Sequence, residues 1–440
     1  MIKKMLFAVA VLTSTLTFAQ PAKVEVKQSG ENWQLLVDGS PYYIKGAGGQ
    51  TNLDKLVEIG GNTIRTWSTD NAKEVLDEAQ SKGIKVMMGL WAQHERHGFD
   101  YDDPVKVKAQ LDGFRAVVNE LKDHPALLIW AVGNEVDLFY TNTNVWYAIE
   151  DIAKMIHEVD PNHPTCTVTA GLDPAEVKLV NERAPSVDIY GVNTYGDIGY
   201  VKNGIREAGW KGPYMITEWG PNGHWEVAKT KWNAPVEQSS TEKANSYESR
   251  YTDYIASDKS KCLGSFVFLW GQKQETTSTW YGLFSEAGES SEALDRLEKI
   301  WTGKDPSNHC PSIGTTLVNG LNKNESIYLE AEEKYDATVT ANDADGDNLI
   351  YKWLIIPEST DIKAGGDAES APLPVSGVFV KRKDNEATFR APKEPGSYRL
   401  FIFIYDKHNH YAYENVPFFV TPRDASKGPS RPISFKRMEM

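Results

Sequence analysis

The segment "MITEWGP", residues 215–221, begins like a buried strand and ends on a charged residue. Its first three residues suit the core of a sheet, but the fourth is Glu218, and a Gly–Pro pair soon stops the strand. A carboxylate is almost never fully buried without a partner. We therefore expect Glu218 to lie at the edge of a site rather than in the core.

The sequence on either side of this segment alternates between short apolar runs and amphipathic helical patterns such as "AKEVLDEAQSKG". The apolar runs lie at residues 43–47, 62–67, 84–91, 126–133, 165–170, 188–194, 213–218 and 263–270. Eight strand–helix units predict an α/β fold, the (β/α)8 TIM barrel. A doubly wound open sheet is the alternative, but "GAGG" at 46–49 lacks the spacing of a phosphate-binding turn.

The first residues predict export from the cytoplasm. Residues 1–19 carry two lysines, an apolar run and a small-residue end at Ala19, the three parts of a signal peptide. We expect cleavage before Gln20. The alternative, a membrane anchor, is disfavoured because the apolar run is short. The sequence therefore predicts a protein that is secreted or periplasmic.

The composition changes after the barrel pattern. Residues 304–318 are rich in turn formers, and the following strands alternate without helical periodicity, which predicts an immunoglobulin-like β-sandwich. The predicted order is a signal peptide at 1–19, a catalytic barrel with an N-terminal hairpin at 20–303, a linker at 304–318, a sandwich at 319–422 and a loose tail at 423–440.

The net charge and the number of cysteines limit the kinds of binding partner and metal site that the sequence predicts. The formal net charge of −14 disfavours nucleic acid as a partner, and no stretch after the signal peptide predicts membrane insertion. Cys166, Cys262 and Cys310 are too few and too scattered for a metal cage, but a disulfide between Cys262 and Cys310 is expected. We expect a monomer that needs no cofactor and no metal.

A second carboxylate follows another predicted barrel strand. The fourth strand, "ALLIWAVGNE", ends in Asn134 and Glu135. The carboxyl ends of all barrel strands open on one face, so Glu135 and Glu218 share the same mouth. Two such carboxylates are what glycoside hydrolysis needs: one protonates the leaving oxygen, and the other attacks or activates water. A single glutamate would more simply pair with an arginine or cap a helix.

The two motifs "WAVGNE" and "ITEWGP" on an eight-unit barrel resemble clan A of the glycoside hydrolases, over roughly residues 42–303. The resemblance implies a retaining mechanism with Glu135 as the acid/base and Glu218 as the nucleophile. It also implies that Asn134 holds the sugar 2-hydroxyl, a contact that strengthens in the transition state.

The same resemblance implies three further site residues. Arg65, near the end of the second strand, would lie beside the nucleophile and lower its pKa, with a surface arginine as the alternative. Tyr195, after the sixth strand, would donate to the nucleophile, and its neighbour Asn193 is a rival for this place. Trp270, after the eighth strand, would form an aromatic floor under the sugar.

Other candidates come from the residues alone. In "WAQHERHG", after the third strand, the spacing of the two histidines does not match the zinc motif HExxH, so no zinc site is predicted. His94 lies near the end of the strand and is a candidate for a sugar contact. Trp67 and Trp219 are candidate cleft aromatics, evenly balanced against core packing.

Within the clan, a barrel with one C-terminal sandwich resembles the endo-β-1,3-glucanases of glycoside hydrolase family 158. This resemblance implies that the substrate is a polysaccharide or oligosaccharide of β-linked glucan, such as laminarin. The alternatives are a β-mannanase or a β-glucan transglycosylase of the same clan, and a non-catalytic glycan-binding protein on a dead barrel.

Overall fold

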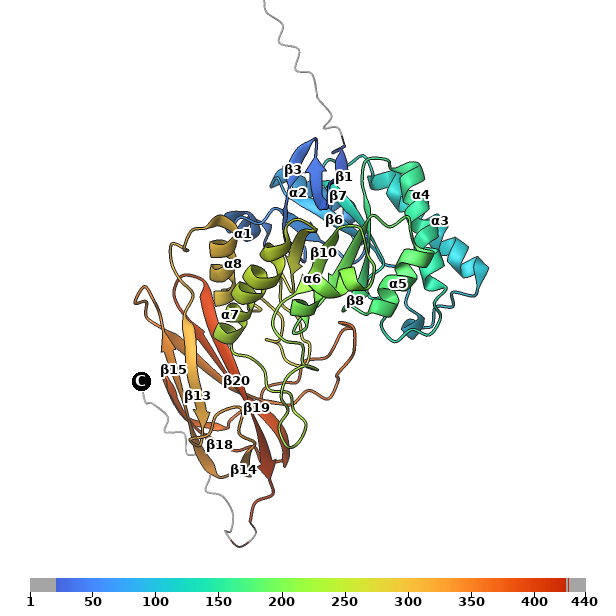
Figure 1. Cartoon of the computed structure of the whole chain (residues 1–440). Helices are drawn as coiled ribbons and strands as arrows, with labels where there is room; N and C mark the ends of the chain where they lie inside the picture. Colours follow the sequence, from blue (N-terminus) through green and yellow to red (C-terminus); the bar gives the residue numbers. More distant parts are fainter. Residues whose placement is uncertain (1–20, 425, 427–440) are drawn as a thin grey trace, which may run out of the picture.

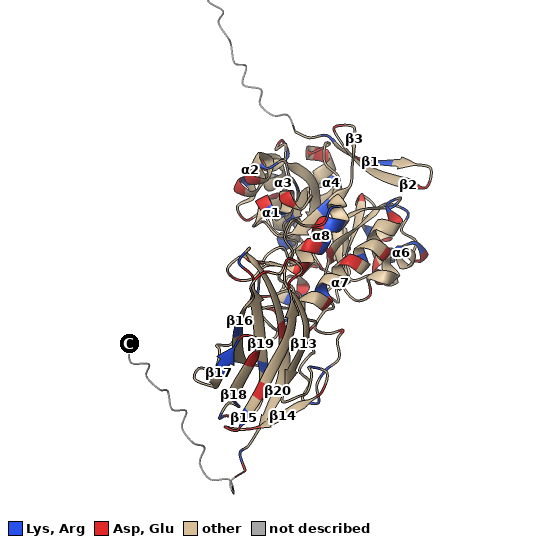
Figure 2. Ribbon diagram, turned by 90° about the vertical axis from the view of Figure 1, so that its left-hand side faces the viewer, with Lys and Arg blue, Asp and Glu red and all other residues tan. Residues whose placement is uncertain are grey.

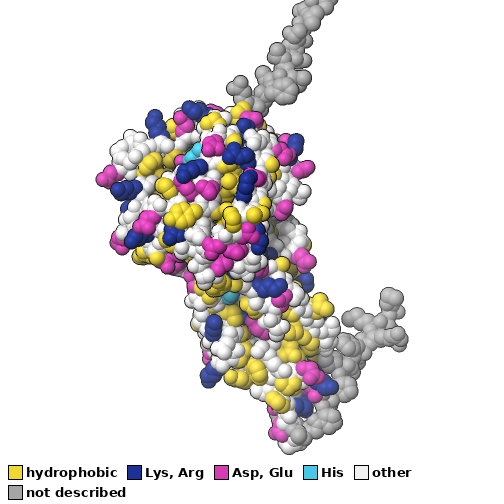
Figure 3. Space-filling model, turned by 90° about the vertical axis from the view of Figure 1, so that its right-hand side faces the viewer, with side chains coloured by type: hydrophobic (Ala, Val, Ile, Leu, Met, Phe, Trp, Pro, Cys, Tyr) yellow, Lys and Arg dark blue, Asp and Glu magenta, His cyan; other side chains and the backbone are white. Residues whose placement is uncertain are grey.

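The computed structural model describes residues 21–424 and residue 426. The predicted signal peptide and most of the predicted tail, residues 427–440 among them, lie outside the described residues. The chain folds into a barrel and a β-sandwich, and one end of the sandwich packs against the side of the barrel (Figure 1). In the space-filling view the sandwich is the narrower part and carries patches of hydrophobic side chains (Figure 3).

The first part is a closed barrel of parallel strands in the order β10-β11-β4-β5-β6-β7-β8-β9. These strands are β4 Ile44–Gly48, β5 Thr63–Arg65, β6 Lys85–Leu90, β7 Leu127–Val132, β8 Thr165–Ala170, β9 Ile189–Asn193, β10 Tyr214–Trp219 and β11 Cys262–Val267. The prediction of a TIM barrel from eight apolar runs is confirmed. The runs read as continuously apolar because parallel strands of a barrel are buried on both faces.

Helices surround the strands. They are α1 Leu53–Glu58, α2 Ala72–Ser81, α3 Pro104–Leu121, α4 Val145–Val159, α5 Pro174–Arg183, α6 Ile198–Glu207, α7 Ser240–Arg250 and α8 Glu292–Thr302, with the short turns η1 Glu95–His97, η2 Tyr251–Ile255 and η3 Ala256–Asp258. Local signals begin several of them. The side chain of Asp103 caps α3 before Pro104, and Ser239 with Glu242 forms a capping box on α7. Acidic and basic residues alternate on their outer faces (Figure 2).

A small sheet covers the end of the barrel that is opposite the mouth. It consists of β1 Val24–Ser29, β2 Asn32–Val37 and β3 Ser40–Tyr42. The Val24 amide donates to the Asn162 carbonyl, and the Trp33 amide donates to the Ser260 carbonyl, both in loops that precede barrel strands. The hairpin side chains join one apolar cluster with the barrel interior. The open end of the barrel is therefore the one where Glu135 and Glu218 lie.

Two sheets form the sandwich. One has the order β12-β20-β19-β16 with β14 also paired to β20, and the other has the order β13-β15-β18-β17. The strands are β12 Ser290–Ser291, β13 Ser312–Val318, β14 Ile327–Glu330, β15 Lys334–Asn342, β16 Ile350–Pro357, β17 Phe379–Lys383, β18 Glu386–Arg390, β19 Gly396–Tyr405 and β20 His410–Thr421. Strand β13 begins inside the range predicted as a linker. Strand β12 precedes the last barrel helix but pairs with the sandwich, so the two parts share a sheet.

A buried polar cluster joins the barrel to the sandwich. The Lys243 ammonium on α7 donates to a Glu237 carboxylate oxygen at 2.5 Å and to the Thr279 carbonyl at 2.6 Å. The Asn415 amide on β20 donates to the other Glu237 oxygen at 2.5 Å. A charge this deeply buried is tolerable only when it is paired, so removing one partner would cost several kcal/mol, about 3–5. The cluster fixes the sandwich against the barrel.

The predicted disulfide does not form. Cys166, Cys262 and Cys310 are all free and buried. The Cys310 thiol lies against the Ser290 carbonyl and the Asp295 carboxylate, whereas the Cys262 thiol lies against Gly264 in the barrel wall. The Cys310 amide donates to Asp295 in the first turn of α8, so the chain after α8 has returned to the start of that helix, away from the base of the barrel where Cys262 begins β11. Within the described residues, no helix is long and apolar enough to span a bilayer.

Candidate active site

The two predicted carboxylates meet at the barrel mouth. Glu218 lies on β10 and is 5% exposed, and Glu135 lies three residues after the end of β7. Asn193, at the end of β9, pairs in register with Glu218. Its side-chain amide donates to a Glu135 oxygen at 2.9 Å. Asn193 therefore links the two carboxylates, since its backbone pairs with Glu218 and its side chain donates to Glu135.

Three donors surround the Glu218 carboxylate. The Arg65 guanidinium donates to Oε1 at 3.0 Å, and the Trp67 indole donates to the same oxygen at 2.8 Å. The Tyr195 hydroxyl donates to Oε2 at 3.1 Å. Hydrogen bonds to a carboxylate and an adjacent cation both favour its charged form. The three donors thus fix both oxygens of Glu218 at the mouth, where one of them can reach a carbon of a bound substrate.

Arg65 connects the ends of several strands. Besides Glu218, its guanidinium donates to the Thr217 carbonyl at 2.8 Å, to Asn193 Oδ1 at 3.3 Å and to Asn134 Oδ1 at 2.6 Å. The side chain is 1% exposed, so the surface alternative for this arginine is excluded. A rigid planar fork can serve several acceptors at fixed angles, which a flexible ammonium cannot do. Arg65 therefore positions the groups around it as well as balancing the charge of Glu218.

Glu135 has the opposite electrostatic surroundings. Burial and the negative charge of Glu218 raise the pKa of Glu135 well above its ordinary value, and only the Asn193 amide opposes them at short range. The backbone at Glu135 has φ of 50°, a left-handed conformation that is costly for a residue with a Cβ. Glu135 thus keeps its proton to a higher pH than an ordinary glutamate does. A protonated carboxyl beside a second carboxyl that three donors hold in place is an arrangement that suits the acid and the nucleophile of glycoside hydrolysis.

An aromatic cluster lines the mouth beside Glu218. Tyr195 packs against Phe268 with ring centroids 6.2 Å apart, and Trp67 meets the same ring at 5.9 Å. Trp225, an exposed residue of the loop after β10, packs edge-on against Tyr195 at 5.7 Å. Tyr281 completes the cluster. Flat apolar faces beside a carboxylate pair are suited to a sugar ring.

Two predicted aromatics do not join this cluster. Trp219 points to the opposite side of β10 from Glu218 and is buried against Tyr247 and Tyr251, because successive side chains of a strand alternate. Trp270 packs against Phe284, and its indole donates to the Thr51 carbonyl. The ring from the eighth-strand region that reaches the cluster is Phe268, not Trp270.

His94 lies in a stack of rings at the edge of the mouth. It packs in parallel on Trp91 at 4.7 Å and accepts a hydrogen bond from Arg96 at 3.1 Å. Burial, and then the charge of Arg96, lower the pKa of His94 to about 4, so its ring is neutral. Asn134 lies within the network, with its carbonyl oxygen engaged by Arg65. The sugar contacts predicted for His94 and Asn134 stay predictions.

The loop after β11 adds a charged pair that the sequence analysis missed. Lys273 and Glu275 form an ion pair at 2.8 Å. Burial raises the pKa of Glu275, Lys273 lowers it, and the negative charge of Glu218 raises it further. Glu275 therefore lies close enough to the nucleophile for the two carboxylates to repel each other. Its sequence context, "QKQETTST", is uniformly polar and gives no signal that one carboxylate is buried.

A segment of the sandwich also reaches the mouth. We call residues 358–378, between β16 and β17, the strap (Figure 1). Asp367 of the strap accepts two hydrogen bonds from Arg96 at 2.8 and 3.2 Å, in the loop after β6. On the far side, the Thr276 amide donates to Glu369 at 2.6 Å, in the loop after β11.

The strap fits closely where it crosses. Gly365 has φ of +63°, and a Cβ at that position would lie 2.7 Å from the Arg96 guanidinium and from Leu138. Leu138 follows Glu135 by one turn of chain. Leu138 lies in the loop after β7, and β7 is four places from β11 in the barrel order, on the opposite side of the mouth. The strap therefore spans the mouth and forms part of its wall.

Part of the chain matches a model of a known protein family. Residues 67–222 match the family model described as "Glycosyl hydrolases family 2, TIM barrel domain". The match contains both glutamates, Asn134, Asn193 and Tyr195. Over 183 residues the chain is 26% identical to a β-glucuronidase of Felis catus, which is 37% of this chain and 26% of that protein. It is 25% identical to a β-glucuronidase of Canis lupus familiaris over the same length. The chain spans about a quarter of the length of these relatives.

Solved structures share the fold. An FMN-binding β-glucuronidase from Faecalibacterium prausnitzii L2-6 aligns with 91% of this chain and 59% of its own, at a TM-score of 0.52 and 14% identity. At this identity the likeness bears on the fold alone.

The comparisons correct the predicted substrate. The curated relatives are β-glucuronidases, so the predicted endo-β-1,3-glucanase is wrong, as are the β-mannanase, β-glucan transglycosylase and non-catalytic glycan-binding alternatives. The closer resemblance to family 158 is not supported either. The coarser resemblance to clan A of the glycoside hydrolases is supported by the matched barrel model and by the curated relatives.

Proposed function

We propose that this chain hydrolyses β-glycosides with retention of anomeric configuration, with Glu218 as the nucleophile and Glu135 as the acid/base. The single observation that carries the proposal is the unequal environment of the two mouth carboxyls. Arg65, Trp67 and Tyr195 all donate to Glu218, whereas burial and the charge of Glu218 keep the proton on Glu135.

In the first step, Glu135 gives its proton to the glycosidic oxygen while the bond between that oxygen and C1 breaks. An oxygen of Glu218 forms a bond to C1 from the opposite face, and the alcohol leaves. The positive charge of Arg65 loses part of its partner as Glu218 becomes an ester. Its other acceptors, Asn134 and Asn193, keep it in place.

In the second step, Glu135 is a carboxylate and acts as the base. It takes a proton from a water molecule whose oxygen bonds to C1, and the ester bond to Glu218 breaks. Neutralising Glu218 in the ester removes the charge that held the proton on Glu135, so the pKa of Glu135 falls when it must act as a base. The site thus returns to its first state with two inversions, which gives net retention.

For the substrate class, we propose β-glucuronides, since the relatives carry that activity in their names. A glucuronide brings a carboxylate that needs a cation. Lys273 is the half-buried cation of the loop after β11, and it is held there by Glu275 at 2.8 Å. Lys273→Ala should therefore raise KM for a β-glucuronide at least tenfold and leave KM for a neutral β-glycoside within twofold.

The experiment is an assay of the purified protein on a panel of 4-nitrophenyl β-glycosides: glucuronide, glucoside, galactoside, mannoside and xyloside. Glu218→Gln should lower kcat by at least 10⁴-fold, and Glu120→Gln, an exposed glutamate of α3, is the matched control. Proton NMR of the first product should show the β-anomer. No hydrolysis of any glycoside, or an α-anomer first, would overturn the proposal.

A further inference from the structure

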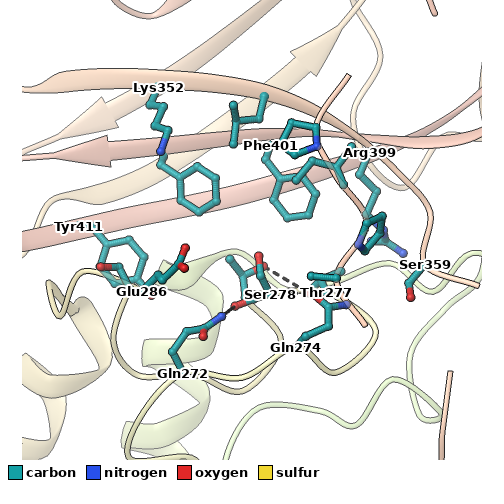
Figure 4. Close-up of a pocket in the computed structure, with 18 of the residues that line it drawn as sticks. Gln272, Gln274, Thr277, Ser278, Glu286, Lys352, Ser359, Arg399, Phe401 and Tyr411 are labelled. Atoms are coloured by element: carbon teal, nitrogen blue, oxygen red, sulfur yellow. Dashed lines mark hydrogen bonds between the residues drawn. The ribbon is translucent and has the colours of Figure 1, made fainter. Parts of the chain in front are cut away.

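A cavity of about 410 Å³ lies between the sandwich and the barrel, and strap residues form part of its lining, which contains neither catalytic glutamate. Figure 4 shows side chains of the sandwich sheet facing the barrel loop that follows β11. Phe401, Arg399 and Lys352 extend from the sandwich side, and Gln272 and Ser278 extend from the barrel side. This volume is within the range of small-ligand sites, about 300–1,000 Å³.

The sandwich wall of the cavity is aromatic. Phe401 and Phe403 on β19 lie side by side with centroids 6.0 Å apart and planes within 6°. Tyr405 and Tyr411 continue this surface at 6.2 Å and 21°. The core of the sandwich is filled by the residues between them, such as Ile402, because side chains alternate across a strand. On this outer face Phe401 and Tyr411 are buried, at 3% and 2% exposed, whereas Phe403 and Tyr405 keep partly exposed rings that line the cavity.

The barrel wall of the cavity is polar, and it holds unused hydrogen-bonding atoms. Thr276 is 4% exposed, and its hydroxyl has no hydrogen-bond partner among the described residues. The same is true of the Gln274 amide nitrogen and the Ser359 hydroxyl, both of which line the cavity. Buried polar groups are nearly always satisfied, so three unpartnered groups around one cavity indicate a ligand that supplies partners.

The cavity shares a wall with the candidate active site. Gln272, Gln274 and Thr276 line the cavity, whereas Lys273 and Glu275, the residues between them, form the ion pair of the catalytic mouth. The loop after β11 therefore contributes residues to both spaces, and it turns sharply at Thr276, whose φ is 62° and whose two neighbours hydrogen-bond to each other.

The charges of the cavity do not select an ion. The Arg399 guanidinium is occupied by Glu358 and Asn415, at 2.6 and 2.7 Å. Lys352 lines the cavity together with two carboxylates, Glu286 and Glu289, so no surplus of positive charge is left to bind an anion. What remains are flat rings, amides and hydroxyls, and these are the groups that bind the faces and the hydroxyls of a neutral sugar.

From this lining we propose that the cavity is a second carbohydrate-binding site, which holds one or two units of a neutral oligosaccharide. The ligand class rests on the proposed function, because the cavity adjoins a glycosidase mouth. Phe403, whose ring is partly exposed, stacks on a sugar ring, and Gln274 and Thr276 bind sugar hydroxyls.

The test measures binding and hydrolysis separately. Glu218→Gln protein is titrated calorimetrically with cellotetraose, xylotetraose and mannotetraose, with and without Phe403→Leu, which keeps apolar volume but removes the ring. At least one tetrasaccharide should bind, and Phe403→Leu should weaken that binding at least tenfold or remove one of two sites. Tyr147→Leu, an exposed aromatic of α4, is the control and should change nothing. Gln274→Leu, a second variant that removes an unpartnered amide, should weaken binding as well.

The same substitutions in the otherwise wild-type protein should leave kcat/KM on the best 4-nitrophenyl glycoside within twofold. Absence of binding by all three tetrasaccharides, or binding unchanged in Phe403→Leu and Gln274→Leu, would overturn the second site. A parallel loss of 4-nitrophenyl glycoside hydrolysis would also overturn it, since the cavity would then be part of the catalytic mouth. An inactive wild type that still loses tetrasaccharide binding with Phe403→Leu would refute the proposed function and leave the cavity as a binding site.

Discussion

At the scale of single residues, Arg65 and Asn193 do the organising work at the mouth. Arg65 donates to acceptors at the ends of three strands, and Asn193 accepts from it while donating to Glu135. The pair transmits the position of one carboxyl to the other. A shift of either residue would change the distance between the two carboxyl groups. That distance decides whether Glu218 attacks the sugar itself or activates a water molecule that does.

Asn193 gives a pH-dependent prediction. Its amide hydrogen bond favours the charged form of Glu135 and so lowers the pKa of that carboxyl. In Asn193→Ala the pKa of Glu135 should rise, and the basic limb of the kcat/KM profile, where the acid loses its proton, should move to higher pH by about half a unit or more. The maximum rate should fall about 10²-fold.

The measurement is a pH–rate profile on an activated β-glycoside, with Asn119→Ala on the outer face of α3 as the control. A basic limb that stays in place or moves to lower pH would mean that Asn193 does not act through Glu135.

The sequence predicted the chemistry of single residues where a motif carried it, and missed residues that depend on the fold. Glu135 and Glu218 follow strands with recognisable ends, so their meeting at one mouth could be predicted. Glu275 is buried only because the loop after β11 folds back under the strap. No local pattern reports such a contact between distant segments.

At the scale of elements, successive side chains of strand β10 point to opposite sides, so one side serves the active site and the other packs in the core. Glu218 faces the mouth and Trp219 faces α7, where it is fully buried against Tyr247 and Tyr251. Both were candidates in the sequence because composition does not reveal which side of a strand faces inward. The strand register, observed in the pairing of Glu218 with Asn193, settles the assignment.

A matched pair of tryptophan variants tests this separation. Trp219→Ala should reduce the free energy of unfolding by about 3–5 kcal/mol through the cavity it leaves, with little change in kcat for the folded protein. Trp67→Phe removes the indole donor to Glu218 and should lower kcat about 10–100-fold while changing stability by less than about 1 kcal/mol. Denaturant unfolding and steady-state kinetics on both variants decide the matter. Loss of kcat in Trp219→Ala, with Trp67→Phe unaffected, would reverse the two assignments.

At the scale of the whole molecule, the sandwich is part of the catalytic unit. Its strap crosses the mouth from Arg96 to Thr276, and β12 of the barrel chain pairs with β20 of the sandwich. The sequence predicted two domains, since the change from helical to strand periodicity is local information. The contact between them is long-range and depends on side chains that only the folded chain brings together.

The strap gives a prediction at this scale. The Arg96–Asp367 pair is partly shielded from solvent, with side-chain exposures of 10% and 35%. Asp367→Ala should free one end of the strap, raise KM at least fivefold and lower kcat by less than threefold, because the groups that touch Glu218 are unchanged. Asp253→Ala, an exposed aspartate of η2, is the control. An unaltered KM would reduce the strap to a surface loop, and a collapse of kcat would make it part of the chemical step.

The proposed mechanism depends on Glu218 being the nucleophile. The most direct test is the anomeric configuration of the product that Glu218→Gly forms from an activated β-glycoside in the presence of azide. If Glu218 attacks C1, its removal leaves space in which azide attacks once, so the product should be the α-glycosyl azide, the inverted form. No azide product from Glu218→Gly, together with a wild-type protein whose first product is the α-anomer, would contradict the account. Glu218 would then activate a water molecule instead of bonding to the sugar.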